Sequence, residues 1–399
     1  MRKTFLLLHR WAGLFMAVFL AIAGLTGAAI AWEHELDRWL NPQLFTPQSQ
    51  GLPALPAAEI ARRLEAANPR LQVSLLPLAA PPGETLLLGV EPRLDPATGR
   101  AHALGFDQMM VDPATAQVQG TRTWGTPSLA PENLVPFLYR LHHTLCLPHL
   151  AGVDWAVWFM GLVAMVWTLD CLIALWLSFP RWRNWRKSLA FRFSRGGQVL
   201  NFDLHRSGGV WTWAALLVLA VTSVAMNLYD EVMEPVVSVF SPTSPSPFDQ
   251  RPRRAPAERR PPAVSVDAVT SLAHAEGLRR GFADPPGMLS HRAAFGLYAV
   301  DFYVPGSARP GLGPPRLYFD SATGALVGDR VPGQGSAGDY FMRLQFPLHS
   351  GRIAGVPGRI LVTLLGLAVA ALSTTGVLLW AMRRRAAAAA APRRPAGGA

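Results

Sequence analysis

The chain has 399 residues, half of them hydrophobic, and a formal net charge of +11. This length suits two or three soluble domains or a small membrane protein with large loops, so the distribution of apolar residues has to decide. The basic charge would suit a nucleic-acid binder, but the Lys and Arg residues cluster beside apolar blocks. We therefore expect a membrane protein with no nucleic-acid partner.

The apolar residues concentrate in four blocks, each at or above the ~20 residues that a helix needs to cross hydrocarbon. The blocks cover roughly residues 11–32, 152–179, 209–229 and 359–382. The first block is longer than the ~7–15 apolar residues of a signal peptide, so we expect an uncleaved helix. The sequence therefore predicts an integral membrane protein that crosses the lipid bilayer four times.

Basic residues indicate the orientation of these spans. They are denser at the start of the chain, in the link "PRWRNWRKSLAFRFSRGG" from Pro180 and in the "RRR" near the end than in the two long connections. The positive-inside rule then places both termini and the short link in the cytoplasm. Both long connections are expected on the external side.

The chain contains an internal repeat. "LHRWAG" from Leu8 matches "LHRSGG" from Leu204, and "VDPATAQVQG" from Val111 matches "FDSATGALVG" from Phe319. "RLHHTLCLPHLAG" from Arg140 aligns with "RLQFPLHSGRIAG" from Arg343. Each half is thus predicted to contain a helix, an external domain, a re-entry segment with histidine and a second helix.

This repeat divides the chain into eight parts. The first half has the N-terminus and first span (1–32), an external domain (33–135) and a re-entry with the second span (136–180). A cytoplasmic link (181–208) leads to the third span (209–229). The second external part (230–340), a re-entry with the fourth span (341–382) and a cytoplasmic tail (383–399) follow. The fold class is a four-helix transmembrane bundle built from two repeats, each with an α+β external domain.

Local patterns support the α+β assignment. Helices are predicted over 55–69 and 265–278, with Ser265 or Asp267 as the cap of the second. Strands are predicted over 72–78, 85–91, 105–112, 295–304 and 315–320. Asp112 and Asp320 begin tight turns into a last strand, because an Asp side chain can bond the backbone two residues on. The Pro- and Arg-rich segment 241–262 is expected to be a disordered linker, and the alanine-rich tail is of low complexity.

Four of the ten histidines form two depth-matched pairs. His9 and His205 occupy the same repeat position at the cytoplasmic edge, and His142 and His349 precede the second and fourth spans on the external side. Two neutral imidazoles from separate helices can bind the two axial positions of a haem. Two such pairs would place one haem near each membrane surface, although a single edge histidine is more often an ordinary interfacial residue.

Other residues around these pairs have two readings each. Arg10 and Arg206 could pair with haem propionates or act as topology signals. Asp170, inside the second span, is either satisfied by a neighbouring helix or part of a proton path. His143 would point about 100° away from its neighbour His142 on a helix. The glycines at 24, 27, 366 and 376, with Ala28, could make room for a macrocycle or allow close helix packing.

Taken together, "LHRWAGL", "RLHHTL", "LHRSGG" and "FPLHSGRIAGVPGR" resemble the PepSY-associated transmembrane proteins. That family includes iron-regulated membrane proteins and bacterial di-haem ferric-siderophore reductases. The resemblance implies a bacterial inner-membrane protein with periplasmic PepSY-like domains. It further implies two b-type haems, held by His9, His142, His205 and His349.

The expected function is transfer of electrons through two haems to a periplasmic ferric chelate such as a siderophore, in iron uptake. No GxGxxG with an α/β pattern occurs, so a separate cytoplasmic or membrane electron donor is expected. The alternative is a non-redox PepSY membrane protein that binds a periplasmic partner or regulates a protease. Enzymatic activity as a ferric reductase thus depends on haem.

Overall fold

The computed structural model describes residues 1–49, 51–179, 181, 183, 185–307 and 310–390. Pro180, Trp182 and Asn184 of the basic link, and residues 391–399 of the predicted tail, lie outside the described residues. The chain divides into two compact units. The first comprises Met1–Trp32, Leu138–Pro235 and Leu348–Ala399, and the second comprises Glu33–Phe137 and Val236–Pro347.

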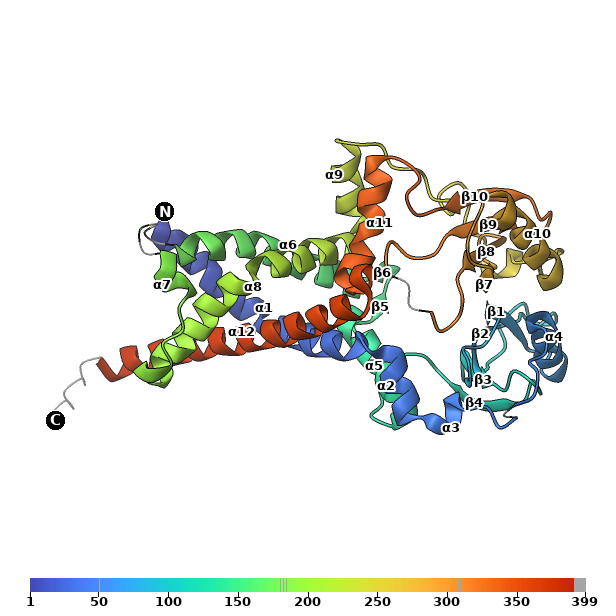
Figure 1. The fold of residues 1–399 in the computed structure, drawn as a ribbon, viewed down its shortest axis with the longest axis horizontal. Helices are drawn as coiled ribbons and strands as arrows, with labels where there is room; N and C mark the ends of the chain where they lie inside the picture. Colours follow the sequence, from blue (N-terminus) through green and yellow to red (C-terminus); the bar gives the residue numbers. More distant parts are fainter. Residues whose placement is uncertain (50, 180, 182, 184, 308–309, 391–399) are drawn as a thin grey trace. The chain divides into compact units, whose positions relative to one another are not determined.

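Within the described residues, four helices are long and apolar enough to cross a membrane, which confirms the four predicted spans. They are α1 (Arg2–Ile30), α6 (Trp155–Ser178), α8 (Gly197–Asn227) and α12 (Gly355–Ala390). Figure 1 shows them as a bundle in which α1 packs along α12 and α6, and α8 packs along α6 and α12. α1 begins and α12 ends at the same end of this bundle (Figure 1).

Two of the four helices start more than two helical turns before their apolar blocks. α1 begins at Arg2 instead of residue 11, and α8 begins at Gly197 instead of residue 209. The residues before each block contain no proline, so the backbone hydrogen bonds of the helix continue through these more polar segments. His9 and His205 therefore lie inside helices, where their side-chain directions are fixed.

Short elements connect the helices of the first unit. They are β5 (His149–Leu150), β6 (Val153–Asp154), α7 (Trp185–Leu189) and the 3-10 turns Phe193–Arg195 and Arg352–Ala354. Asp154 caps α6 by accepting hydrogen bonds from the backbone N–H groups of Ala156 and Val157. A π-helical turn, Tyr229–Met233, follows α8 and leads to α9 (Glu234–Ser238). Both cysteines are free thiols.

The re-entry segments are helical. α5 (Pro131–Thr144) carries His142 near its end, and α11 (Ala337–His349) ends on His349. Each helix contains an internal proline, Pro136 in α5 and Pro347 in α11.

The second unit contains an antiparallel sheet of eight strands among the described residues, in the order β10-β9-β8-β7-β1-β2-β3-β4. The strands of the first half are β1 (Leu71–Pro77), β2 (Leu86–Pro92), β3 (Gln108–Val111) and β4 (Val118–Arg122). Those of the second half are β7 (Pro286–Arg292), β8 (Leu297–Phe302), β9 (Arg316–Asp320) and β10 (Leu326–Arg330). The two predicted external domains contribute four strands each to this sheet, and β1 pairs with β7, which joins both halves into one sheet.

Each half of the sheet has its own helix and apolar core. α4 (Ala57–Ala67) packs Ile60 and Leu64 against β1, β2 and β3, and α10 (Val266–Arg279) packs Val269 and Ala273 against β7, β8 and β9. Ser265 caps α10 by accepting from the N–H of Ala268. The two short helices α2 (Glu33–Leu40) and α3 (Pro42–Phe45) precede α4.

Both predicted aspartate turns are present. Asp112 Oδ1 accepts from the backbone N–H groups of Ala114 (3.0 Å) and Thr115 (3.2 Å). Asp320 Oδ1 accepts at 2.9 Å from those of Ala322 and Thr323. The turns close the β3–β4 and β9–β10 hairpins.

The segment 241–262 is not a free linker, in contrast to its composition. Arg251 forms an ion pair of 2.7 Å with Asp320, and the N–H of Arg254 donates to the carbonyl of Ala294. Partial burial opposes ionisation of Asp320, but the Arg251 guanidinium and the turn N–H groups lower its pKa to about 2. These contacts hold the Pro- and Arg-rich segment on the second half of the sheet.

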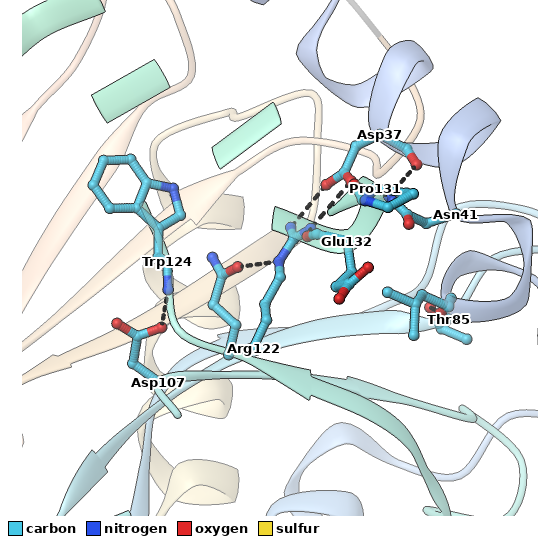
Figure 2. A network of polar contacts seen from close by, with 10 residues as sticks. Asp37, Asn41, Thr85, Asp107, Arg122, Trp124, Pro131 and Glu132 are labelled. Atoms are coloured by element: carbon cyan, nitrogen blue, oxygen red, sulfur yellow. Dashed lines mark hydrogen bonds and ion pairs between the residues drawn. The ribbon is translucent and has the colours of Figure 1, made fainter. Parts of the chain in front are cut away.

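A buried ion pair anchors the first half of the sheet (Figure 2). Arg122 at the end of β4 and Asp37 in α2 meet at 2.8 Å, with 4% and 8% of their side chains exposed. Arg122 also donates to Gln108 and to the carbonyl of Glu132 at the start of α5. Asn41 donates to Asp37 and to the carbonyl of Pro131. The network ties α2 and the first turn of α5 to the sheet.

Candidate functional site

The four histidines singled out in the sequence meet in two pairs within the first unit. The ring centres of His9 and His205 lie 6.0 Å apart with planes inclined by 49°. Those of His142 and His349 lie 6.1 Å apart with planes inclined by 54°. Each pair joins a residue from the first half of the chain to one from the second.

The two pairs occupy different levels of the bundle. His142 bonds the carbonyl of Ala23 on α1, whereas His9 lies near the start of the same helix. From His9 to Ala23, α1 rises by about 21 Å at 1.5 Å per residue. We name the His9–His205 pair the inner pair and the His142–His349 pair the outer pair.

Each imidazole is held through its Nδ1 atom. His142 lies 2.9 Å from the carbonyl oxygen of Ala23, and His205 lies 3.0 Å from that of Leu372. His349 lies 3.0 Å from the Thr222 hydroxyl, and His9 lies 2.9 and 3.0 Å from the two carboxylate oxygens of Asp170. A different helix from the one carrying the histidine supplies the partner in every case.

These partners fix the tautomer. Carbonyl and carboxylate oxygens only accept, so Nδ1 of His142, His205 and His9 carries the hydrogen. The Thr222 hydroxyl donates to the carbonyl oxygens of Val218 and Leu219, and it therefore accepts from His349. In a neutral imidazole with this tautomer, the other ring nitrogen, Nε2, keeps its lone pair. An Nδ1–H group bonded to a second partner is the usual arrangement of a metal-binding histidine.

Two glycines lie next to the Cε1 atoms of His142 and His205. A Cβ atom on Gly27 would lie 2.8 Å from Cε1 of His142, and one on Gly376 would lie 3.0 Å from Cε1 of His205. Gly24 and Gly366 serve close helix packing instead, since a Cβ on either would lie within 2.5 Å of the other's carbonyl oxygen. Close helix packing, one of the two predicted roles, is therefore present at Gly24 and Gly366, whereas Gly27 and Gly376 lie against histidine rings.

A cavity of about 510 Å³ surrounds the inner pair. Apolar side chains such as Leu20 and Trp167 line it, and five arginines contribute to its wall: Arg2, Arg10, Arg206, Arg383 and Arg384. Its volume lies in the ordinary range of ligand pockets, about 300–1,000 Å³. A hydrophobic cavity with cations on its wall suits a flat apolar ligand that carries carboxylates.

The two predicted arginines differ in their surroundings. Arg10 is exposed and lies over the ring of Trp11, 5.3 Å from its centre. Arg206 donates to the carbonyl of Lys187 and lies 3.7 Å from Asp203. Both reach the cavity wall, and pairing of either with haem propionates remains a prediction.

The remaining histidines take no part in the pairs. Nδ1 of His143 donates to the carbonyl of Tyr139 on its own helix at 2.7 Å, so the structure pairs His142 and not His143 with His349. His34 lies beside Glu84, and His149 is exposed in β5.

The threonine and carbonyl partners were not expected from the sequence. Their signal was present in the repeat, because Thr26 and Thr222 follow His9 and His205 at the same spacing. Each threonine hydroxyl donates to its own helix and lies close to the outer histidine of its half. The sequence left two roles open for Asp170, a contact with a neighbouring helix or a proton path. The structure shows the contact, because Asp170 bonds His9 on the neighbouring helix.

The geometry of each pair fits a bis-histidine haem. Metal–imidazole bonds of about 2.0 Å on either side of one ion, plus about 1.1 Å to each ring centre, separate two ring centres by about 6 Å. The described residues contain no group of three or more His, Cys, Asp or Glu side chains that could hold a metal ion. A metal at either pair would thus need other ligands, and the four nitrogens of a porphyrin supply them.

The fold and site define a multi-pass membrane protein with two facing histidine pairs in its helical bundle. A comparison with protein families matches residues 6–383 to the PepSY-associated TM region, and the chain belongs to this family. This confirms the resemblance seen in the motifs. A comparison with curated proteins finds no match.

Proposed function

We propose that this protein is a bacterial inner-membrane electron carrier that holds two b-type haems, one at each histidine pair. The carrying observation is that the four histidines form two pairs with ring centres 6.0 and 6.1 Å apart, with Nδ1 of every ring bonded to a neighbouring helix. His9 and His205 would bind one haem, and His142 and His349 the other. Their matching contacts in the two halves favour a repeat origin of the bundle.

The bound haems would supply one-electron chemistry, and the residues of the chain would hold, orient and shield them. Nδ1 partners on neighbouring helices fix the imidazole planes, and Gly27 and Gly376 leave space for the rings behind them. The cavity at the inner pair has an apolar wall that would contact the macrocycle, and Arg10 and Arg206 would face the propionates.

Two haems would divide electron transfer across the membrane into shorter steps. The hydrocarbon core is about 30 Å thick, and the two levels on α1 are about 21 Å apart along the helix. Electrons from a cytoplasmic or membrane donor would enter at the inner pair and leave from the outer pair. The acceptor would be a periplasmic ferric chelate, for which a siderophore is the expected case, because ferrous iron is bound less tightly by hard oxygen ligands.

The test is a haem count on the purified protein in detergent. We expect two b-type haems per chain in the reduced-minus-oxidised spectrum. His9→Ala or His205→Ala should remove one of them, and His142→Ala or His349→Ala the other. His143→Ala is the matched control and should keep both, because this ring bonds its own helix.

A protein without haem, or with a spectrum that none of the four substitutions changes, would refute the proposal. The alternative, a non-redox protein that binds a periplasmic partner or regulates a protease, would then stand. Where haem is present, vesicles that enclose a ferric chelate, with a reductant outside, test electron transfer across the bilayer.

A further inference from the structure

Asp170 differs from the residues that hold the other three histidines. His142 and His205 donate to backbone carbonyls, with the Thr26 and Thr375 hydroxyls at 3.3 and 3.2 Å, and His349 bonds Thr222. All of these partners are uncharged. His9 alone bonds a carboxylate, and both of its oxygens lie within 3.0 Å of Nδ1.

Orientation of the ring does not require this charge. The three other histidines are oriented by neutral oxygens at comparable distances, and a threonine at position 170 could orient His9 in the same way. Asp170 is nevertheless buried, with 11% of its side chain exposed, at a depth where an ionisable residue is costly. The carboxylate therefore adds an effect beyond orientation.

We propose that Asp170 is a positioning residue that lowers the reduction potential of the haem at the inner pair below that of the haem at the outer pair. This inference rests on the function proposed above. A carboxylate that accepts the Nδ1 hydrogen makes the imidazole a stronger donor to the metal. Together with its negative charge in a weakly polar medium, it stabilises ferric over ferrous iron.

The consequence is a direction for electron transfer. With haems bound at both pairs, one electron would pass from the inner iron, which would go from ferrous to ferric, to the outer iron, which would go from ferric to ferrous. A lower potential at the inner pair makes this step favourable from the inner to the outer level. If all four histidines had neutral partners, these partners would cause no difference in reduction potential between the two haems.

The experiment is a spectroelectrochemical titration of the haem-loaded protein. Asp170→Thr gives His9 the partner type found at the other sites, and Asp170→Asn keeps the side-chain size without the charge. We expect both variants to shift the midpoint potential of the inner haem to more positive values and to leave the outer midpoint unchanged. Repeating the titration with His349→Ala, which should leave only the inner haem, assigns the midpoints.

Thr168→Ala is the matched control on α6, because the Thr168 hydroxyl donates only to Ala164 of its own helix among the described contacts. It should move neither midpoint. Unchanged midpoints in both Asp170 variants with both haems bound would overturn the inference. So would loss of the inner haem in both variants, because Asp170 would then hold the site instead of tuning it. Absence of haem from the unaltered protein would refute the proposed function itself.

Discussion

At the scale of single residues, glycines leave room for two of the four histidine rings. Gly376 is the clearest case, since its missing side chain leaves room for Cε1 of His205. We expect Gly376→Ala to push this ring off its position, as added methyl groups in packed sites cost about 1–3 kcal/mol. The haem count should fall from two toward one, with the outer haem retained.

Gly27→Ala should instead cause loss of the outer haem with the inner haem retained, because its Cβ would lie 2.8 Å from Cε1 of His142. Gly208→Ala on α8 serves as control, since its Cβ would meet only Leu372 Cδ2 at 3.8 Å, an ordinary contact. Full haem content with unaltered spectra in both test variants would show that the glycines do not position the rings.

A second prediction concerns the buried pair of Asp37 and Arg122. Arg122→Met leaves a carboxylate buried without its cation, which is expected to cost about 3–5 kcal/mol of stability. Thermal unfolding of the purified protein should show a lower transition temperature for the second unit. Asp37→Leu combined with Arg122→Met should recover part of the loss, because no unpaired charge then remains.

The exposed pair of Arg62 and Asp267 provides the comparison. Their side chains are 63% and 60% exposed, so solvent screens the interaction and Arg62→Met should leave the transition nearly unchanged. Equal effects of the two arginine substitutions would contradict a special role for the buried network in Figure 2.

At the scale of elements, β1 and β7 join the two halves of the sheet through three residue pairs, which include Leu75 with Ser290. Directly opposite residues in antiparallel strands have Cα atoms about 4.5–5.5 Å apart, within the range that a disulfide spans. We therefore expect Leu75→Cys with Ser290→Cys to form a disulfide on mild oxidation. Mass spectrometry of the digested protein would detect the linked peptides.

Gln72→Cys with Ser290→Cys is the control, since Gln72 pairs with Glu91 on β2 and lies three residues along the strand from Leu75. It should give no link. Equal linkage in both pairs would show that the β1–β7 register differs from the one described.

Much of the fold was predictable from sequence because its signals are local. The apolar blocks, the α4 and α10 helices and the turns at Asp112 and Asp320 each depend on a few neighbouring residues. β7 was missed because Pro286–Arg292 has no clean alternation, and its pairing with β1 and β8 decides its conformation. The joined sheet could not be foreseen, since the strands concerned are far apart in sequence.

The candidate site divides in the same way. The repeat indicated that His9 and His205 belong together, and similar depth in the membrane indicated the same for His142 and His349. The structure places the ring centres of these pairs 6.0 and 6.1 Å apart. The partners of Nδ1 depend on how helices pack, and the Arg122–Asp37 pair depends on a contact between α2 and β4. Composition alone also mistook the segment 241–262 for a free linker, although Arg251 pairs with Asp320.

At the scale of the whole molecule, the direction of electron flow depends on orientation in the membrane. Basic residues stand at one end of the bundle, with Arg2 and Lys3 at the start of α1 and three arginines, 383–385, near the end of α12. The positive-inside rule predicts that this end, with the inner pair, lies in the cytoplasm. Under the proposed function, the sheet-containing unit is expected in the periplasm.

Fusions to reporter proteins test this orientation in living bacteria. A fluorescent protein that matures only in the cytoplasm should fluoresce at the C-terminus, and alkaline phosphatase, active only in the periplasm, should be active when inserted within 241–262. The opposite pattern would place His9 and His205 at the periplasmic face. The charge of Asp170 would then favour electron flow toward the cytoplasm, which is incompatible with reduction of an external chelate. Orientation and potential difference must therefore agree for the proposed function to hold.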